Sequence, residues 1–172
     1  MKKNLLFFSI IIFVVVLLCV GVKVQSVDDY YQEHLDDIKP GDMTVFLEIE
    51  CVDILNNYEL LDKGLKDSGI VPNDGVVLAN KEYILRNDDT PYNILLRATK
   101  ASKISIVTQS SQVFGTMYVQ SIAGISEKGC GVMSGWMCFV NDEAINVGIS
   151  QYKLKNKDKI TIKFVCDYTS IL

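Results

Sequence analysis

The sequence has very little histidine and no excess of basic charge. His34 is its one histidine, and the formal net charge at pH 7 is −4. A Ser-His-Asp triad, or a cysteine nucleophile activated by histidine, would lack its base, because His34 lies upstream of the predicted domain. An acidic chain with singly scattered lysines also lacks the basic face that binds a nucleic-acid backbone. These absences argue against histidine-dependent catalysis and against nucleic-acid binding.

Motifs for metal, phosphate and glycoside chemistry are also missing. The sequence has no C-x-x-C pair for zinc and no glycine loop followed by a helix that would cradle a phosphate. Carboxylate pairs occur only in predicted spacers or turns, where charged side chains are normally solvated: Asp28/Asp29, Asp36/Asp37, Asp88/Asp89 and Asp142/Glu143. We therefore expect a protein that is not an enzyme, with no metal site.

The N-terminal residues predict export from the cytoplasm. Lys2 and Lys3 precede an apolar run over residues 5–22, which is the charge pattern of a signal peptide. The run is also close to the length that spans a membrane. Residues 1–26 are thus either a signal peptide, cleaved after Gly21 or Ser26, or an uncleaved membrane anchor helix. Both alternatives place the remainder on the extracellular side of the membrane or in secreted form, as an acidic spacer (residues 27–42) and one domain (residues 43–172).

Short alternating segments predict a domain rich in β-strands. Residues 44–54 place Val45, Leu47, Ile49 and Cys51 on one face of a first strand. Further strands are predicted at residues 76–78, 82–85, 104–108, 116–122, 136–140 and 159–167. Turns are predicted at residues 72–75 and at Asn141-Asp142.

The sequence predicts one clear helix, beginning at Thr90-Pro91. Thr90 can cap the helix, and proline suits the first helical position because its missing N–H has no partner there. An apolar stripe follows at Tyr92, Leu95, Leu96 and Thr99. Residues 56–69 are polar, and we expect them to be irregular with at most a helical turn. The fold class expected is α+β, with one twisted sheet of short strands wrapped around one helix.

Four cysteines lie outside the apolar run, and an even number in an exported chain permits disulfides. Cys51 and Cys166 each end a predicted strand, so they can bridge if those strands are neighbours. We therefore predict the pairs Cys51–Cys166 and Cys130–Cys138. The alternative is four reduced thiols.

The region around the one tryptophan is the predicted binding surface. Gly135 places the indole of Trp136 beside a flexible backbone, an arrangement that can grip a flat ligand. Hydroxyl, amide and further aromatic groups complete the candidate ligand-binding set: Tyr118, Ser134, Gly135, Trp136, Gln151 and Tyr152. The alternative for each residue is a purely structural role, with Trp136 filling the core.

The order of several motifs resembles the transcobalamin-like C-terminal domain family, which consists of small β-grasp modules. The resemblance spans residues 43–168, and the matching segments are 49–51, 75–78, 90–96, 118–125 and 134–141, followed by Gly148, Tyr152, Leu154 and Asp158. The chain departs from the family pattern at Asp142 and Lys157, where glycine is usual. It also departs at Cys138, where tyrosine is common, and this favours a tie between Cys138 and Cys130.

The resemblance implies a β-grasp module in an exported protein of a Gram-positive bacterium. In the animal carriers of this family the module closes over one face of cobalamin, beside a larger helical domain that does not fit in this chain. Cobalamin is therefore possible by resemblance only. The function expected is a non-catalytic binding module for a cobalamin-like small ligand, or for a surface protein or glycan. The alternative is a structural component of an adhesin-type surface assembly.

Overall fold

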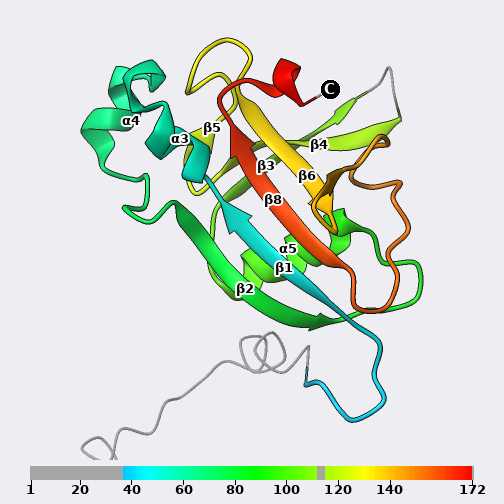
Figure 1. Ribbon diagram of the computed structural model, residues 1–172. Coiled ribbons are helices and arrows are strands. Elements are labelled where there is room, and N and C mark those ends of the chain that lie inside the picture. The colour runs from blue at the N-terminus through cyan, green and yellow to red at the C-terminus, as the bar shows by residue number, and fades with distance from the viewer. Residues whose placement is uncertain (1–36, 112–114, 172) are drawn as a thin grey trace, which may run out of the picture. The chain divides into compact units, whose positions relative to one another are not determined.

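The computed structural model describes residues 37–111 and 115–171, which fold into a mixed α+β domain (Figure 1). The predicted signal peptide or anchor (residues 1–26) and most of the acidic spacer lie outside the described residues. Among the helices that are described, none combines the length and the apolar character needed to cross a membrane.

Strands dominate the domain. The elements in chain order are β1 (Thr44–Glu50), α3 (Val52–Asn56), η1 (Tyr58–Leu60), α4 (Lys63–Ser68), β2 (Val76–Ile84), α5 (Pro91–Ala101), β3 (Ile106–Ser111), β4 (Thr116–Ile122), β5 (Ile125–Ser126), β6 (Gly135–Val140), β7 (Glu143–Ala144), β8 (Lys159–Val165) and η2 (Tyr168–Ser170). The described strands form two sheets, ordered β2-β1-β8-β6-β7 and β3-β4-β5. The prediction of a single sheet was therefore wrong.

The larger sheet has a parallel pair at its centre. β1 and β8 run parallel, with Leu47 beside Ile160 and Ile49 beside Ile162. β2 pairs with β1, and β6 with β8, in antiparallel register. The alternation predicted for β1 is confirmed, because Val45, Leu47 and Ile49 are each 0% exposed. Helix α5 covers this apolar face of the sheet (Figure 1), and its Ile94, Leu95 and Ala98 complete the main core.

The start of α5 follows the prediction closely. The Thr90 side chain accepts a hydrogen bond from the backbone N–H of Asn93, and the Asn93 side chain accepts one from the Thr90 N–H. This reciprocal capping satisfies two backbone donors that the first turn leaves without partners. The buried face consists of Ile94, Leu95, Ala98 and Thr99 rather than the predicted stripe, because Tyr92 and Leu96 are only half-buried.

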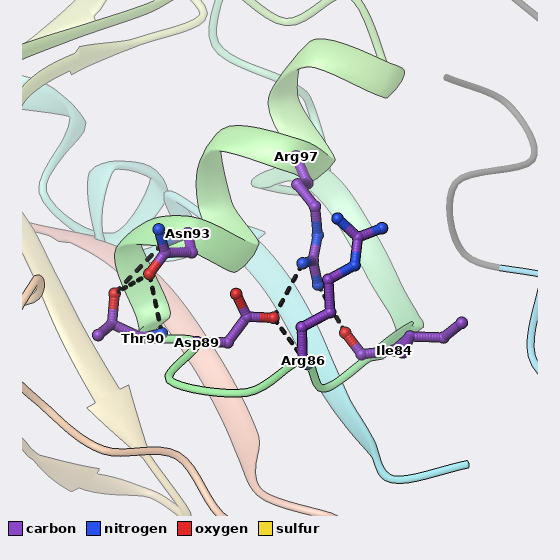
Figure 2. A network of polar contacts seen from close by, with 6 residues as sticks. All are labelled: Ile84, Arg86, Asp89, Thr90, Asn93 and Arg97. Carbon is purple, nitrogen blue, oxygen red and sulfur yellow. Dashed lines mark hydrogen bonds and ion pairs between the residues drawn. The ribbon is translucent and has the colours of Figure 1, made fainter. Parts of the chain in front are cut away.

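A buried ion pair attaches α5 to the end of β2 (Figure 2). The Arg97 guanidinium donates to the Asp89 carboxylate at 2.8 Å and to the Ile84 carbonyl oxygen at 2.6 Å. The same Asp89 oxygen accepts from the Arg86 N–H at 2.9 Å. The Arg97 and Asp89 side chains are 15% and 9% exposed. Of the pair Asp88/Asp89, Asp89 is the buried member, and its carboxylate fixes the loop between β2 and α5.

Several predicted boundaries differ from the structure. β1 ends at Glu50, and residues 52–56 form α3 because the Cys51 N–H bonds to the Gly75 carbonyl oxygen and turns the chain. The two short strands predicted at 76–85 are one strand, β2, whose polar centre is exposed at the sheet edge. Residues 56–69 contain η1 and α4, the latter capped by the Asp62 side chain. The two-residue strands β5 and β7 were not predicted.

Both predicted turns are present. Gly75 has a φ of +72°, and its N–H bonds to the Pro72 carbonyl oxygen at 3.0 Å. Asn141 and Asp142 have φ values of +54° and +69° between β6 and β7. Asn and Asp tolerate this left-handed region better than other non-glycine residues, so the turn forms without the glycine usual in the resembling family.

Candidate functional site

A groove lies between β4 of the smaller sheet and β6 of the larger one. It is lined by residues 116–119 of β4, 136–138 of β6, 145 and 147–149 of the loop that follows β7, and 162 of β8, and its volume is about 200 Å³. The groove is open where the two strands have no partner strand on the facing edges. β5 pairs only with Ser121 and Ile122 of β4, and β7 only with Phe139 and Val140 of β6.

Trp136 forms one end of the groove and joins the two sheets. It lies on β6, and its indole N–H donates to the Ile125 carbonyl oxygen of β5 at 2.8 Å. Its ring meets Phe164 of β8 edge to face, with 5.2 Å between ring centroids and an interplanar angle of 79°. The indole is half-buried, so it is neither sealed in the core nor free. Its N–H is occupied, and only its apolar ring surface is available to a ligand.

The loop after β7 closes the other end. The Ile145 N–H bonds to the Cys138 carbonyl oxygen at 3.1 Å, which ties the loop to β6. The Ser150 hydroxyl lies 2.9 Å from that of Thr116 and accepts from the Met117 N–H at 3.1 Å, which ties the loop to β4. Gly148 packs directly on Thr116, so closely that a Cβ at Gly148 would overlap the Thr116 side chain. The groove is therefore fixed at both ends by specific contacts.

The groove is electrically neutral. None of the described lining residues is an acid or a base that is charged at pH 7. Burial raises the pKa of the free Cys138 thiol to about 12, because the thiolate would lose its hydration. The groove therefore offers apolar and hydroxyl contacts and no ion pair.

The structure brings two of the six predicted site residues to the groove, Tyr118 and Trp136. Ser134 is 2% exposed, and its hydroxyl accepts from the Cys130 N–H and donates to the Gly131 carbonyl oxygen, which fixes the loop before β6. Gly135 begins β6 opposite Val165 and does not line the groove.

The other two residues lie next to the groove. The Gln151 side chain accepts from the Gly148 N–H at 3.3 Å, and the Tyr152 N–H bonds to the Gly148 carbonyl oxygen. Both thus support the loop that forms the groove wall. Whether any of the six residues contacts a ligand stays a prediction. Thr116 and Ser150 were not predicted, because no local pattern marks a hydroxyl pair 34 residues apart.

Both predicted disulfide pairings were wrong. The structure has one disulfide, Cys130–Cys166, with 5.1 Å between the Cα atoms, and leaves Cys51 and Cys138 free within its described residues. The strand register explains the difference. The parallel pairing of β1 with β8 ends at Glu50 beside Lys163, and at Cys51 the chain turns into α3, so Cys51 does not follow β8 as far as Cys166. Cys138 lies opposite Ile162 in mid-strand, away from the end of β8 that Cys130 approaches.

One family model matches the part of the chain that forms the groove. Residues 88–165 match the family model of a domain of unknown function, DUF4430. That region runs from the loop before α5 to the end of β8 and includes every lining residue of the groove. No curated protein matches the sequence. The finer assignment to the transcobalamin-like C-terminal domain family stays a prediction.

Two solved structures are similar in outline. One is haptocorrin in complex with Cbi, at 12% identity and a TM-score of 0.49 over 74% of this chain. The chain spans only 26% of the length of haptocorrin. The other is a protein from Ruminococcus gnavus ATCC 29149 described as metal-binding, at 8% identity and a TM-score of 0.41, covering 72% of this chain and 96% of that one.

Proposed function

We propose that this domain is a non-catalytic binding module that holds a small, uncharged, apolar group in the groove between β4 and β6. The observation that carries the proposal is a neutral groove of about 200 Å³, with the half-buried indole of Trp136 at one end. Apolar walls with a few fixed polar groups are typical of small-molecule sites. The module is exported, as the N-terminal pattern predicts, and acts outside the cell or at its membrane surface.

The size of the groove limits what it holds. Sites that enclose a drug-sized ligand have volumes of roughly 300–1,000 Å³. At about 200 Å³, the groove takes a ring or a short alkyl chain, either as a small molecule or as one substituent of a larger ligand. A corrinoid would be covered on one side only, so a cobalamin-like ligand would need a second partner for its other face.

The strand order supports the finer fold assignment. A hairpin (β1–β2), a helix on one face (α5) and a last strand (β8) parallel to the first are the features of the β-grasp arrangement. In this arrangement α5 covers the centre of the large sheet. The smaller sheet and the groove lie beside β6.

The positions of three carboxylates from the pairs noted in the sequence support a non-catalytic role. Asp89 is engaged by Arg97, and Asp142 and Glu143 are exposed in the turn after β6. None of the three lines the groove. A glycosidase would need two carboxylates that face each other across a cleft.

Trp136 fluorescence and Cys138 alkylation together test the proposal, because both residues line the groove. The full chain is titrated with hexanol, benzyl alcohol and cobinamide. At least one probe should change the Trp136 emission saturably and slow the reaction of Cys138 with iodoacetamide. Cys51, which is buried elsewhere, serves as the reference thiol.

A matched pair of variants locates the binding. Cys138→Phe fills the groove and should abolish the response, whereas Val132→Phe adds the same ring at a position that is 75% exposed and should leave the response intact. Thermal unfolding of both variants shows whether each remains folded. If no probe affects either residue, or if folded Cys138→Phe responds like the unmodified chain, the proposal is wrong.

A further inference from the structure

The smaller sheet is built entirely from uncharged residues. From Ile104 to Ser126 the sequence has no Asp, Glu, Lys, Arg or His, although 22% of the chain is charged and the net charge is −4. This run contains the whole of β3, β4 and β5. Exposed strands normally carry charged side chains, especially at a sheet edge such as β3. By contrast β2, at the edge of the larger sheet, carries Lys81 and Glu82.

The outer face of β3 and β4 carries a hydrogen-bonded row of aromatic and amide side chains. Gln109 of β3 lies directly opposite Tyr118 of β4. The Tyr118 hydroxyl donates to Gln109 Oε1 at 2.8 Å, and Gln109 Nε2 donates to Gln120 Oε1 at 2.8 Å. Tyr118 is 36% exposed, and Val107 on the same face is 50% exposed. The three polar side chains are thus held in fixed positions at the surface.

This row retains hydrogen-bonding capacity. A primary amide has two N–H donors, and the Gln109 amide uses one of them within the row. The Gln120 amide acts in the row only as an acceptor, and its two N–H groups have no partner in the described part of the chain. Side chains that are already ordered lose little conformational entropy when a ligand binds. The face therefore offers an apolar ring and preordered amide donors side by side.

We propose that the outer face of β3 and β4 binds a neutral carbohydrate chain. A sugar ring presents C–H groups that pack on an aromatic face and hydroxyl groups that bond to planar amides. It requires no ionic partner, which fits a sheet without charge. An anionic polymer would meet no cation on this sheet and would be repelled by the net negative charge of the protein. This site lies beside the groove, shares Tyr118 with it, and extends the binding surface beyond the proposed function.

Calorimetric titration of the full chain tests the proposal, with the protein kept in a detergent that has no sugar headgroup. Cellohexaose and chitohexaose are the neutral probes, and hexagalacturonate is the anionic one. We expect saturable binding of at least one neutral hexasaccharide and no binding of hexagalacturonate. Tyr118→Ala removes the ring and should weaken the binding by about tenfold or more. Gln109→Glu adds a charge with little change of shape and should weaken it similarly.

Two control variants distinguish this site from the groove and from a general effect of added negative charge. Asn80→Asp adds a charge to an exposed position of β2 and should leave carbohydrate binding unchanged. Cys138→Phe fills the groove and should also leave it unchanged, so loss of the groove function and loss of this site give different results. The proposal is overturned if neither neutral probe binds at millimolar concentration, if hexagalacturonate binds equally well, or if folded Tyr118→Ala binds normally. It is also overturned if sedimentation shows that this face instead pairs with a second copy of the chain and excludes the sugars.

Discussion

Gly148→Ala should destabilise the domain far more than Gly135→Ala, although both change one glycine to alanine near the groove. A Cβ at Gly148 would overlap the Thr116 Oγ1 and Cβ atoms and would lie 2.6 Å from Cγ2. At Gly135 the nearest atom is the Glu127 Cβ, at 3.9 Å, which is an ordinary contact. Neither glycine has a left-handed backbone, so the two substitutions differ in packing and not in backbone strain.

The expected magnitudes follow from overpacking. Forcing a methyl group into an occupied site costs about 1–3 kcal/mol. Thr116 cannot rotate out of the way, because its own Cβ is among the overlapping atoms and β3 holds its backbone. Gly135→Ala should change stability by no more than about 1 kcal/mol, in the stabilising direction, since alanine restricts the unfolded chain and suits a strand better.

Urea unfolding of the full chain, followed by the emission of its single tryptophan, measures both effects. Thr116→Gly provides the decisive control, because it removes all three overlapping atoms. Gly148→Ala should cost at least about 1 kcal/mol less in that background than in the unmodified chain. Equal costs in the two backgrounds, or equal stability of the two alanine variants, would refute the packing argument.

Three further predictions concern the disulfide, the ion pair and the free thiol. Cys130→Ser opens a loop of 36 residues and should lower the free energy of unfolding by about 3–4 kcal/mol, measured by urea unfolding; an unchanged midpoint would contradict the disulfide. Arg97→Leu leaves the buried Asp89 carboxylate without its partner and should lower the free energy of unfolding by about 3–5 kcal/mol. Lys153→Leu breaks the exposed pair with Asp88 and should lower it by less than about 1 kcal/mol. Similar losses in the two variants would mean that burial does not decide the strength of the pair. Burial raises the pKa of Cys138 to about 12, so this thiol should react with iodoacetamide at least about thirtyfold more slowly at pH 7 than a thiol of pKa 9.0, because the lower thiolate fraction outweighs the higher nucleophilicity of its thiolate. Its rate should rise about tenfold per pH unit from pH 7 to 10, as followed by peptide mass spectrometry; a plateau near pH 9 would contradict the raised pKa.

The sign of the Cys138 effect also applies to stability. The folded-state pKa lies above the unfolded one, so the folded form keeps its proton over a pH range in which the unfolded form has lost it. The contribution is present below about pH 9 and is lost as the pH rises above it. Cys138→Ser should therefore flatten the alkaline decline in stability.

The parts of the fold that the sequence predicts are those with local causes. Alternation identifies β1, because every second residue (Val45, Leu47 and Ile49) points to the face of the sheet that α5 covers. Thr90 and Pro91 define the start of α5, because capping depends on residues three apart. Asn141-Asp142 forms its turn for the same reason, since the side chains themselves tolerate the required backbone.

The parts that the sequence does not predict depend on register. The division into two sheets depends on which strand edges β4 and β6 leave without partners, and alternation does not encode this. The disulfide depends on the loop with Cys130 meeting the end of β8, and on the chain turning into α3 at Cys51 before it reaches Cys166. The groove needs Gly148 to meet Thr116, and neither residue is unusual in its own segment. Only the neighbourhood of Tyr118 and Trp136 was anticipated.

The bond from the Trp136 indole to the Ile125 carbonyl oxygen has a consequence for motion. Together with the contact of Gly148 on Thr116, it attaches the small sheet to the large one at two separated points. Two attachment points prevent the hinge-like opening that a single attachment would permit. The width of the groove is therefore fixed before a ligand enters it. A ligand would then be selected by its fit to the groove, and its entry would not wait for a conformational change of the protein.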